Sequence, residues 1–259
     1  MTSTTFLNKL SKHTKLFVPL SIVIWVMIWH IASVSIEQSL LLPSPVEVLK
    51  RMLSLIRSES FWQTSAMSLW RILFGFIWGV LFGVILSVLS HIIYPLRIFF
   101  SPLISVLRAT PVASFIILVW SFTGSERLPL FISAIMVLPI IYTNVLSGLD
   151  GVRGELKEVA KVYDLSFKDK LKVLYLPETM PYFTAALTAS IGLAWKAGIA
   201  AEVLAYTANS IGRELYRAKA TLEITDLFAW TVWIILLSIT LEFIAKQLLK
   251  LFKRRRKNV

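Results

Sequence analysis

The sequence contains no cysteine, which excludes a disulfide, a thiolate metal site and a cysteine nucleophile. Its three histidines, His13, His30 and His91, lie far apart, so they have no metal-ligand spacing. The chain also lacks the GxxxxGK[ST] loop with which Walker proteins hold ATP. The sequence therefore offers no metal site, no ATP-binding loop and no recognisable catalytic pair.

Charged residues are scarce as well. They make up 16% of the 259 residues, against 56% hydrophobic residues, whereas a soluble domain carries about a quarter charged residues. The apolar residues fall in runs of about 20, which is the length that crosses about 30 Å of hydrocarbon as a helix. These features predict an all-α, polytopic membrane helical bundle, organised as one domain over residues 1–259.

Six apolar stretches are long enough to span a membrane. They cover about 16–36, 69–93, 98–122, 128–149, 182–206 and 226–249. A signal peptide would have a shorter apolar region of about 7–15 residues, so we expect the first stretch to be retained. Arg108 and Pro111 interrupt the third stretch. Between the spans, Val46–Ile56 is expected as an amphipathic interfacial helix and residues 207–225 as a polar loop.

Glycines in the second span recur with helical spacing. Gly75, Gly79 and Gly83 stand at i, i+4 and i+8, which places them on one face of a helix. Small residues on one face let another helix backbone approach closely. We interpret this face as a packing surface. Arg71, near the outer end of the same span, is expected to extend to the lipid headgroups.

The net charge of +12 is concentrated at the ends of the spans. This distribution favours membrane topology and lipid headgroups over nucleic acid as its explanation. Six spans place both termini on the same side, and lysine and arginine are concentrated at the termini and between residues 153 and 172. The positive-inside rule therefore predicts that both termini and the segment after the fourth span are cytoplasmic.

That segment, residues 154–181, is a polar island between two apolar spans and reads GELKEVAKVYDLSFKDKLKVLYLPETMP. It contains Glu158-Val159-Ala160, three residues, Asp164, nine residues, and then Leu174-Tyr175-Leu176-Pro177. This spacing resembles the cytoplasmic coupling loop of binding-protein-dependent ABC importer permeases, E-A-A-x3-G-x9-I-x-L-P. Val159 replaces an alanine and Asp164 replaces the glycine of the turn. Because aspartate tolerates a left-handed backbone, the turn is expected to survive.

Other segments share this resemblance, which covers about residues 40 to 250. They are Leu107-Arg108-Ala109-Thr110-Pro111, Pro139 through Asn144, Ala194-Trp195 and Ala201-Glu202. The chain is most similar to permeases of the sulfonate, taurine and nitrate type. The resemblance implies about six transmembrane helices, with a coupling helix between the fourth and the fifth, in a prokaryotic inner membrane. It also implies the residues that couple to the ATPase: Glu158, Val159, Ala160, Asp164, Leu174, Leu176 and Pro177.

The resemblance implies partners too. A second permease copy, here expected as a homodimer, a pair of ATPase subunits and an extracytoplasmic solute-binding protein would complete such an importer. The permease itself would use no cofactor, since ATP and magnesium would bind to the ATPase. The expected function is ATP-driven import of a small solute, such as a sulfonate, nitrate or similar anion, by alternating access.

Charges within the spans are costly unless they are paired or hydrated, at about 2.5–3.5 kcal/mol each. Arg108, Lys196 and Glu202 are such residues, and Trp195 lies beside Lys196. Either they line the translocation pathway or they pair inside the bundle. Lys196 and Glu202 differ by about 240° around the helix axis, so they do not face each other. Arg108 is a candidate partner for Glu202, which would leave Lys196 to attract an anionic solute.

Two other functions remain open from the sequence. A secondary transporter driven by an ion gradient would need intramembrane acids, of which Glu202 is almost the only one. An intramembrane enzyme would need a nucleophile with a base, and His30 and His91 stand in no such motif. Neither alternative accounts for the coupling-loop spacing.

Overall fold

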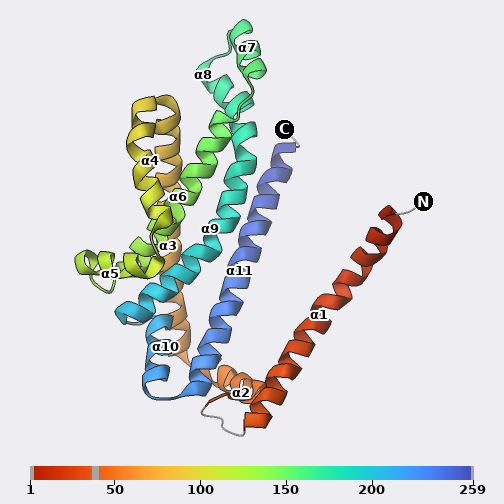
Figure 1. Ribbon diagram of the computed structural model, residues 1–259, viewed down its shortest axis with the longest axis vertical. Coiled ribbons are helices and arrows are strands. Elements are labelled where there is room, and N and C mark those ends of the chain that lie inside the picture. Colours follow the sequence, from red (N-terminus) through yellow and green to blue (C-terminus); the bar gives the residue numbers. More distant parts are fainter. Residues whose placement is uncertain (1–2, 37–40, 258–259) are drawn as a thin grey trace. The chain divides into compact units, whose positions relative to one another are not determined.

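The computed structural model describes residues 3–36 and 41–257, and within these ranges every secondary-structure element is a helix (Figure 1). The elements are α1 Ser3–Ile36, α2 Pro45–Ile56, α3 Glu59–Ile92, α4 Tyr94–Ala109, α5 Val112–Thr123, α6 Leu128–Asp150, α7 Gly154–Val162, α8 Phe167–Asp169, the π-helix η1 Lys170–Tyr175, α9 Leu176–Ala205, α10 Ile211–Ala220 and α11 Ile224–Lys257. The all-α class predicted from the sequence is confirmed.

Five stretches within these ranges are long and apolar enough to cross a membrane alone. They are Pro19–Ile36, Glu59–Ile92, Leu128–Asp150, Phe167–Ala205 and Ile224–Leu251. Helices α4 and α5 form a sixth crossing only if they are counted together, because they meet at an angle of 111°. The predicted third span is therefore broken. Pro111 causes the break, since a proline forces the residue before it out of the helical region, and Thr110 has ψ of 131°.

Two other sequence-based boundaries change in the structure. The fifth membrane-spanning helix was expected to begin near residue 182, but one helical stretch runs without a break from Phe167 to Ala205. The second half of the polar island is thus the beginning of that helix. The expected polar loop at 207–225 contains α10, so that prediction was wrong. Helix α10 has no continuous apolar run, because it contains the polar residues Arg213, Glu214 and Arg217. A search for apolar runs therefore does not detect it as a helix.

The contacts divide the chain into two compact units. The smaller unit contains residues 1–61 and 217–233, and the larger contains residues 62–216 and 234–259. In the smaller unit, Ser44 and Glu47 form a reciprocal capping box that begins α2, the interfacial helix predicted at Val46–Ile56. The hydrogen bonds from Ser44 lower the pKa of Glu47. Arg51 of α2 donates to both carboxylate oxygens of Asp226, which ties α2 to the beginning of α11.

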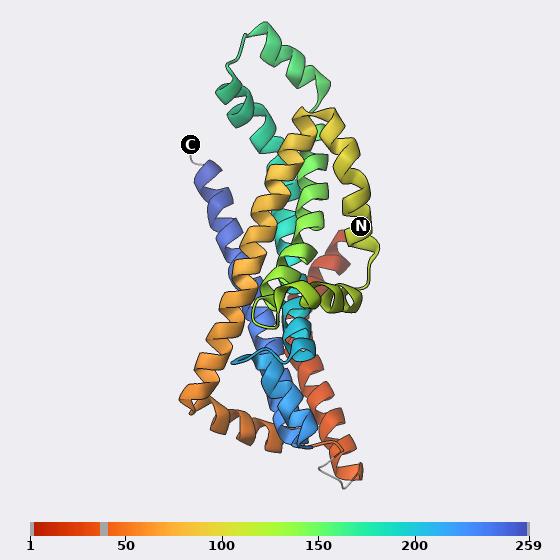
Figure 2. The ribbon, with the colours of Figure 1, turned by 90° about the vertical axis from the view of Figure 1, so that its left-hand side faces the viewer.

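Helix α6 forms the centre of the larger unit. Leu128, Ile132, Val137 and Ile141 of α6 are all fully buried. They pack on the small residues of α9, which runs beside α6 along much of its length (Figures 1 and 2). Alanines let the two backbones approach closely, as is typical of helix packing in membranes. The core of this unit is therefore the α6–α9 pair. Polar segments lie at both ends of this pair.

The glycine face predicted on α3 packs on α6. A Cβ atom at Gly75 would collide with the backbone of Leu130, and one at Gly79 would lie 2.6 Å from the Ala134 carbonyl oxygen. A Cβ at Gly83 would lie 2.8 Å from the Ile141 side chain. All three sites require the absence of a side chain, so the predicted packing surface is confirmed.

Candidate functional site

The coupling segment, residues 154–181, begins with a helix that has one buried side and one exposed side. Ala160 is 3% exposed and packs with Val152 and Leu174, which are also buried. Glu158 lies on the opposite side and is exposed. Of the residues predicted for coupling, Ala160 and Leu174 thus hold the segment together from within. Their place in the motif reflects the fold of the segment.

An apolar surface remains on the exposed side of this helix. Val159, Val162 and Tyr163 stand at i, i+3 and i+4 and are 51%, 82% and 75% exposed. Phe167, just beyond the turn, is 75% exposed. These four residues are called the apolar face below. Only Val159 was singled out from the sequence, although the spacing of Val162 and Tyr163 on a charged helix was a usable signal.

The turn at Asp164 has the left-handed backbone predicted for it, with φ of 45°. The N–H of Leu165 donates to the Ala160 carbonyl and the N–H of Asp164 donates to the Lys161 carbonyl. This pair of bonds is the Schellman arrangement that ends many helices, with Asp164 at the position where glycine is usual. Leu165 completes it by packing against the cluster around Ala160. Ser166 then begins the next helical stretch by accepting from the N–H of Asp169.

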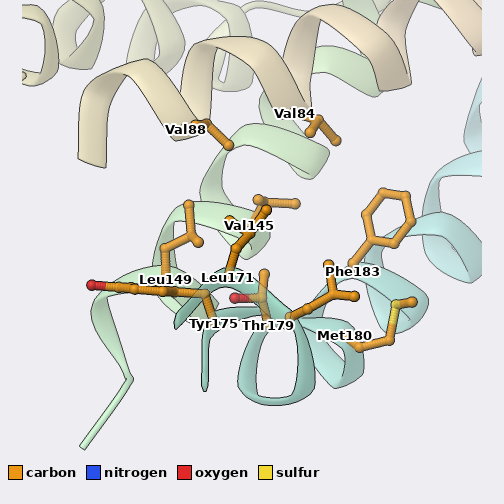
Figure 3. A pocket seen from close by; sticks show the side chains of 10 residues that line it. Val84, Val88, Val145, Leu149, Leu171, Tyr175, Thr179, Met180 and Phe183 are labelled. Carbon is orange, nitrogen blue, oxygen red and sulfur yellow. The ribbon is translucent and has the colours of Figure 1, made fainter. Parts of the chain in front are cut away.

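The second half of the coupling segment enters α9 through a π-helix, Lys170–Tyr175. An apolar cavity of about 220 Å³ lies beside it (Figure 3). Tyr175, Leu176 and Thr179 line this cavity together with residues of α3 and α6. Leu176 and Pro177, predicted from the motif, therefore form the first turn of α9, and Leu176 faces the cavity.

A charged cluster lies at the same end of the larger unit. Asp150, the last residue of α6, accepts from Arg97 of α4 at 2.7 Å and contacts His91 Nδ1 of α3 at 2.7 Å. The His91 ring packs edge-on against Tyr175 of the π-helix at 5.6 Å. Helices α3, α4 and α6 and the coupling segment are thus joined at one point, which favours their movement as one body.

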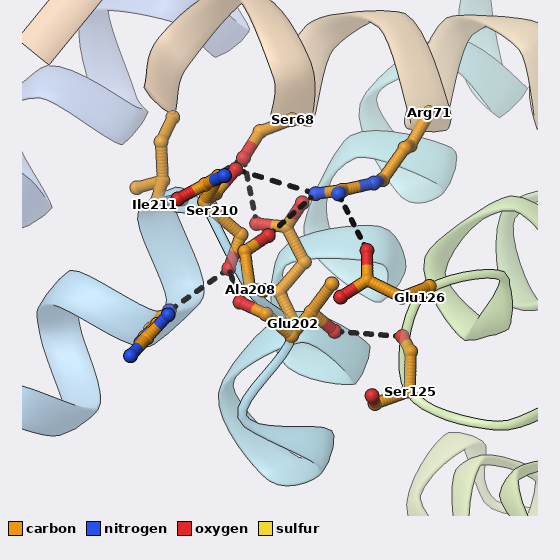
Figure 4. A network of polar contacts seen from close by, with 11 residues as sticks. Ser68, Arg71, Ser125, Glu126, Glu202, Ala208, Ser210 and Ile211 are labelled. Carbon is orange, nitrogen blue, oxygen red and sulfur yellow. Dashed lines mark hydrogen bonds and ion pairs between the residues drawn. The ribbon is translucent and has the colours of Figure 1, made fainter. Parts of the chain in front are cut away.

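A second polar network surrounds Glu202 near the other end of α9 (Figure 4). Glu202 is fully buried, and its Oε2 accepts from Ser68 Oγ at 2.9 Å and from the N–H of Gly212 at 3.2 Å. Ser68 Oγ accepts in turn from the N–H of Ile211. Glu202 therefore fixes the beginning of α10 against α3 and α9. The absence of a side chain at Gly212 permits this, since a Cβ there would collide with Glu202.

Arg71 belongs to the same network, which corrects its sequence-based placement. It pairs with Glu126 at 2.8 Å and donates to the carbonyl oxygens of Ala208 and Asn209. Its side chain is 11% exposed, so it does not extend to the headgroups. The proposed partner of Glu202 was also wrong: Arg108 is exposed, and the contacts of Glu202 come from Ser68 and Gly212. Ser68 and Glu126 had no motif that would have identified them.

The remaining pathway candidates separate into two environments. Trp195 is 1% exposed and donates to the Ile234 carbonyl of α11 at 3.1 Å, so it fills the bundle. Lys196 is exposed, although its neighbours Trp195 and Ala197 are buried. Lys196 and Glu202 lie on different sides of α9, as their spacing predicts. Within the described part of the chain, Lys196 and Arg108 are both exposed cations inside apolar helices.

Comparison with known proteins finds one family model and several permease proteins that are similar to this chain. The model of the family described as "Binding-protein-dependent transport system inner membrane component" matches residues 75–258. The putative aliphatic sulfonates transport permease protein SsuC of Escherichia coli K12 is 32% identical over 237 residues, covering 90% of this chain and 88% of that protein. The nitrate import permease protein NrtB of Synechococcus elongatus is 36% identical over 104 residues, covering 40% of this chain and 37% of that protein.

A solved structure has a similar fold. The crystal structure of an amino acid ABC transporter with histidines aligns with a TM-score of 0.61 at 20% identity, covering 79% of this chain and 98% of that chain. At this level of identity the likeness concerns the fold. The helices of this chain are therefore arranged as in that structure.

Proposed function

We propose a role for this chain from one premise: it belongs to the family of binding-protein-dependent transport system inner membrane components. It is therefore the membrane-spanning permease subunit of an ABC importer and not an enzyme. Such a subunit works with an ATPase and a solute-binding protein. In the proposed assembly two copies of this chain form a homodimer, and ATP and magnesium bind to the partner ATPases.

The coupling segment is the proposed contact with the ATPase. The observation that carries this proposal is the apolar face, which is exposed on a helix whose other side is packed against Leu174. Four large apolar side chains in water indicate a protein contact, because their burial would be favourable. Glu158, Lys157 and Lys161 would surround that contact with charge.

Movement of the ATPases would pass through this segment into α9. The contacts of Asp150 with His91 and Arg97 would hold the end of α6 rigid at the point where the coupling segment begins. The π-helix at the other end of the segment, with the cavity beside it, leaves room for a change of helical pitch. π-Helical turns are frequent at functional sites. Rigid-body rotation of the membrane helices about this joint would open the pathway to alternate sides.

The pathway itself is proposed to lie between the two copies. Lys196 and Arg108 are exposed on apolar helices, and a charge at that depth needs protein or water around it. The break between α4 and α5 supports the same location, since irregular backbone within a membrane lies against protein or lines a watered cavity. These cations suit a small oxyanion such as a sulfonate or nitrate, in line with what the relatives' names describe.

Both termini and the coupling segment are proposed to be cytoplasmic. Lysine and arginine are concentrated there, and in the larger unit the end of α11 lies at the same end as the coupling segment (Figure 1). The absence of native cysteine permits a direct test. Lys161→Cys should resist an impermeant thiol reagent in intact cells and react after the cells are opened. Labelling from outside would reverse the orientation.

Uptake into proteoliposomes that contain the ATPase and the binding protein tests the proposed pathway. Lys196→Met should leave assembly with the ATPase intact and reduce uptake of the anion at least tenfold. Lys219→Met, which removes an exposed lysine of α10, is the matched control and should transport normally. Undiminished uptake by Lys196→Met would place the pathway elsewhere.

A further inference from the structure

A groove with a volume of about 570 Å³ lies between α9 and α11 in the larger unit. Thr184, Ala185, Thr188 and Ala189 of α9 form one wall, and Lys246 and Lys250 on α11 lie on the other. The two lysines are one helical turn apart and therefore face the same side. These α9 residues are all small, so their side chains leave the space of the groove open. Pro181, the last residue of the coupling segment, also lines this groove, whereas the Glu202 network contributes no residue to it.

The charge of the groove is positive. Lys246 lies 3.7 Å from the Glu242 carboxylate and is still 54% exposed. Lys250 is exposed and has no ion pair with any residue that the structure describes. Glu242 sits against α9 at Gly192, where its carboxylate occupies the space of a missing side chain. The Glu242 carboxylate therefore accompanies one of the two ammonium groups, that of Lys246, and the Lys250 ammonium is available to an anion.

The threonines supply hydrogen-bond acceptors. Thr184 Oγ1 donates to the Pro181 carbonyl at 3.0 Å and Thr188 Oγ1 donates to the Thr184 carbonyl at 2.9 Å. Each hydroxyl has one proton and two lone pairs, so with the proton used its oxygen can still accept. The groove thus combines cations for an anion with acceptors for a hydroxyl or amine on the same ligand.

We propose that this groove binds the phosphate headgroup of an anionic phospholipid, with phosphatidylglycerol as the type. The lysines would contact the phosphate, the threonine oxygens would accept from the glycerol hydroxyls, and an acyl chain would follow the alanines and Leu249. Basic pockets between membrane-spanning helices at the cytoplasmic side bind such headgroups. The chain continues into the basic run Lys253–Lys257, which adds attraction to an anionic leaflet. Only the assignment to the cytoplasmic leaflet rests on the proposed function.

Native mass spectrometry of the full-length protein in detergent, titrated with phosphatidylglycerol or phosphatidylcholine, tests the proposal without any transport assay. Phosphatidylglycerol should bind more tightly. Lys246→Gln and Lys250→Gln should each weaken its binding by about fivefold, and the double variant by about twenty-five-fold. The double variant Lys50→Gln/Lys219→Gln removes the same charge outside the groove and should bind like the wild type. Equal loss in both double variants would overturn the proposal in favour of diffuse attraction.

A variant that fills the groove tests the contribution of its shape to lipid binding independently of its charge. Ala189 is exposed on the α9 wall, so Ala189→Trp can fill the groove while both lysines remain. It should weaken phosphatidylglycerol binding as strongly as loss of the lysines. Retained lipid binding with a dissociated dimer would show instead that a second copy occupies the groove. Displacement of the lipid by millimolar inorganic phosphate would refute the lipid as the source of the phosphate. Failure of ATPase coupling would leave these measurements unaffected.

Discussion

Replacement of Val162 by aspartate tests the apolar face of the coupling segment. Val162 is 82% exposed in this chain, so its side chain makes little contribution to the stability of the isolated protein. Full burial of a valine against a partner contributes about 1.5–3 kcal/mol. Loss of about 2 kcal/mol corresponds to about thirtyfold weaker association with the ATPase, and the carboxylate must also be desolvated. Val162→Asp should thus fold normally and bind the ATPase at least thirtyfold more weakly.

Ala160→Asp is the informative comparison because it lies two residues away on the buried side. It would place a carboxylate between Val152 and Leu174, at a cost of several kcal/mol. The coupling segment should then lose its structure and become sensitive to protease, whereas Val162→Asp should keep it resistant. Both variants should transport poorly, for different reasons.

The assay is co-purification of the detergent-solubilised permease with its ATPase over a concentration series, together with limited proteolysis. Leu222→Asp is the matched control, since Leu222 is also exposed and already has a left-handed backbone that aspartate tolerates. It should bind the ATPase normally. Wild-type ATPase affinity in Val162→Asp would refute the proposed contact, and protease-resistant Ala160→Asp would refute the internal packing.

Three further predictions concern the fold. Asp164→Gly should be tolerated and should stabilise the coupling segment by up to about 1 kcal/mol in hydrogen exchange, because glycine relieves the left-handed strain; a clear loss would mean that the aspartate side chain is itself required. Gly75→Val should lower the free energy of unfolding by about 1–3 kcal/mol, since its side chain would collide with the Leu130 backbone, whereas Gly154→Ala has open space and should melt like the wild type. Glu202→Gln should lower it by about 1–3 kcal/mol, because the amide would place N–H donors at the buried Oε1 position, where no partner accepts them; an unchanged melting temperature would remove Glu202 from its structural role.

The class of the molecule follows from the amino-acid sequence alone. Runs of about 20 apolar residues permit only helices that cross a membrane, because backbone groups in lipid must bond within their own segment. Local chemistry determined the turn at Asp164 and the capping box at Ser44, since both depend on residues within a few positions. The glycine spacing on α3 was likewise sufficient to identify a packing face.

Which polar residues contact one another depends on how the helices pack. The sequence offered Arg108 as a partner for Glu202. In the structure Glu202 accepts hydrogen bonds from Ser68, which lies more than a hundred residues earlier in the chain, and from Gly212. A buried charge specifies that it needs a partner without specifying which one. Similarly, the coupling motif located Ala160 and Val159 together, but the packing of Leu174 placed the first inside and left the second exposed. Burial depends on which residues pack together once the chain has folded, and residue spacing alone does not determine this.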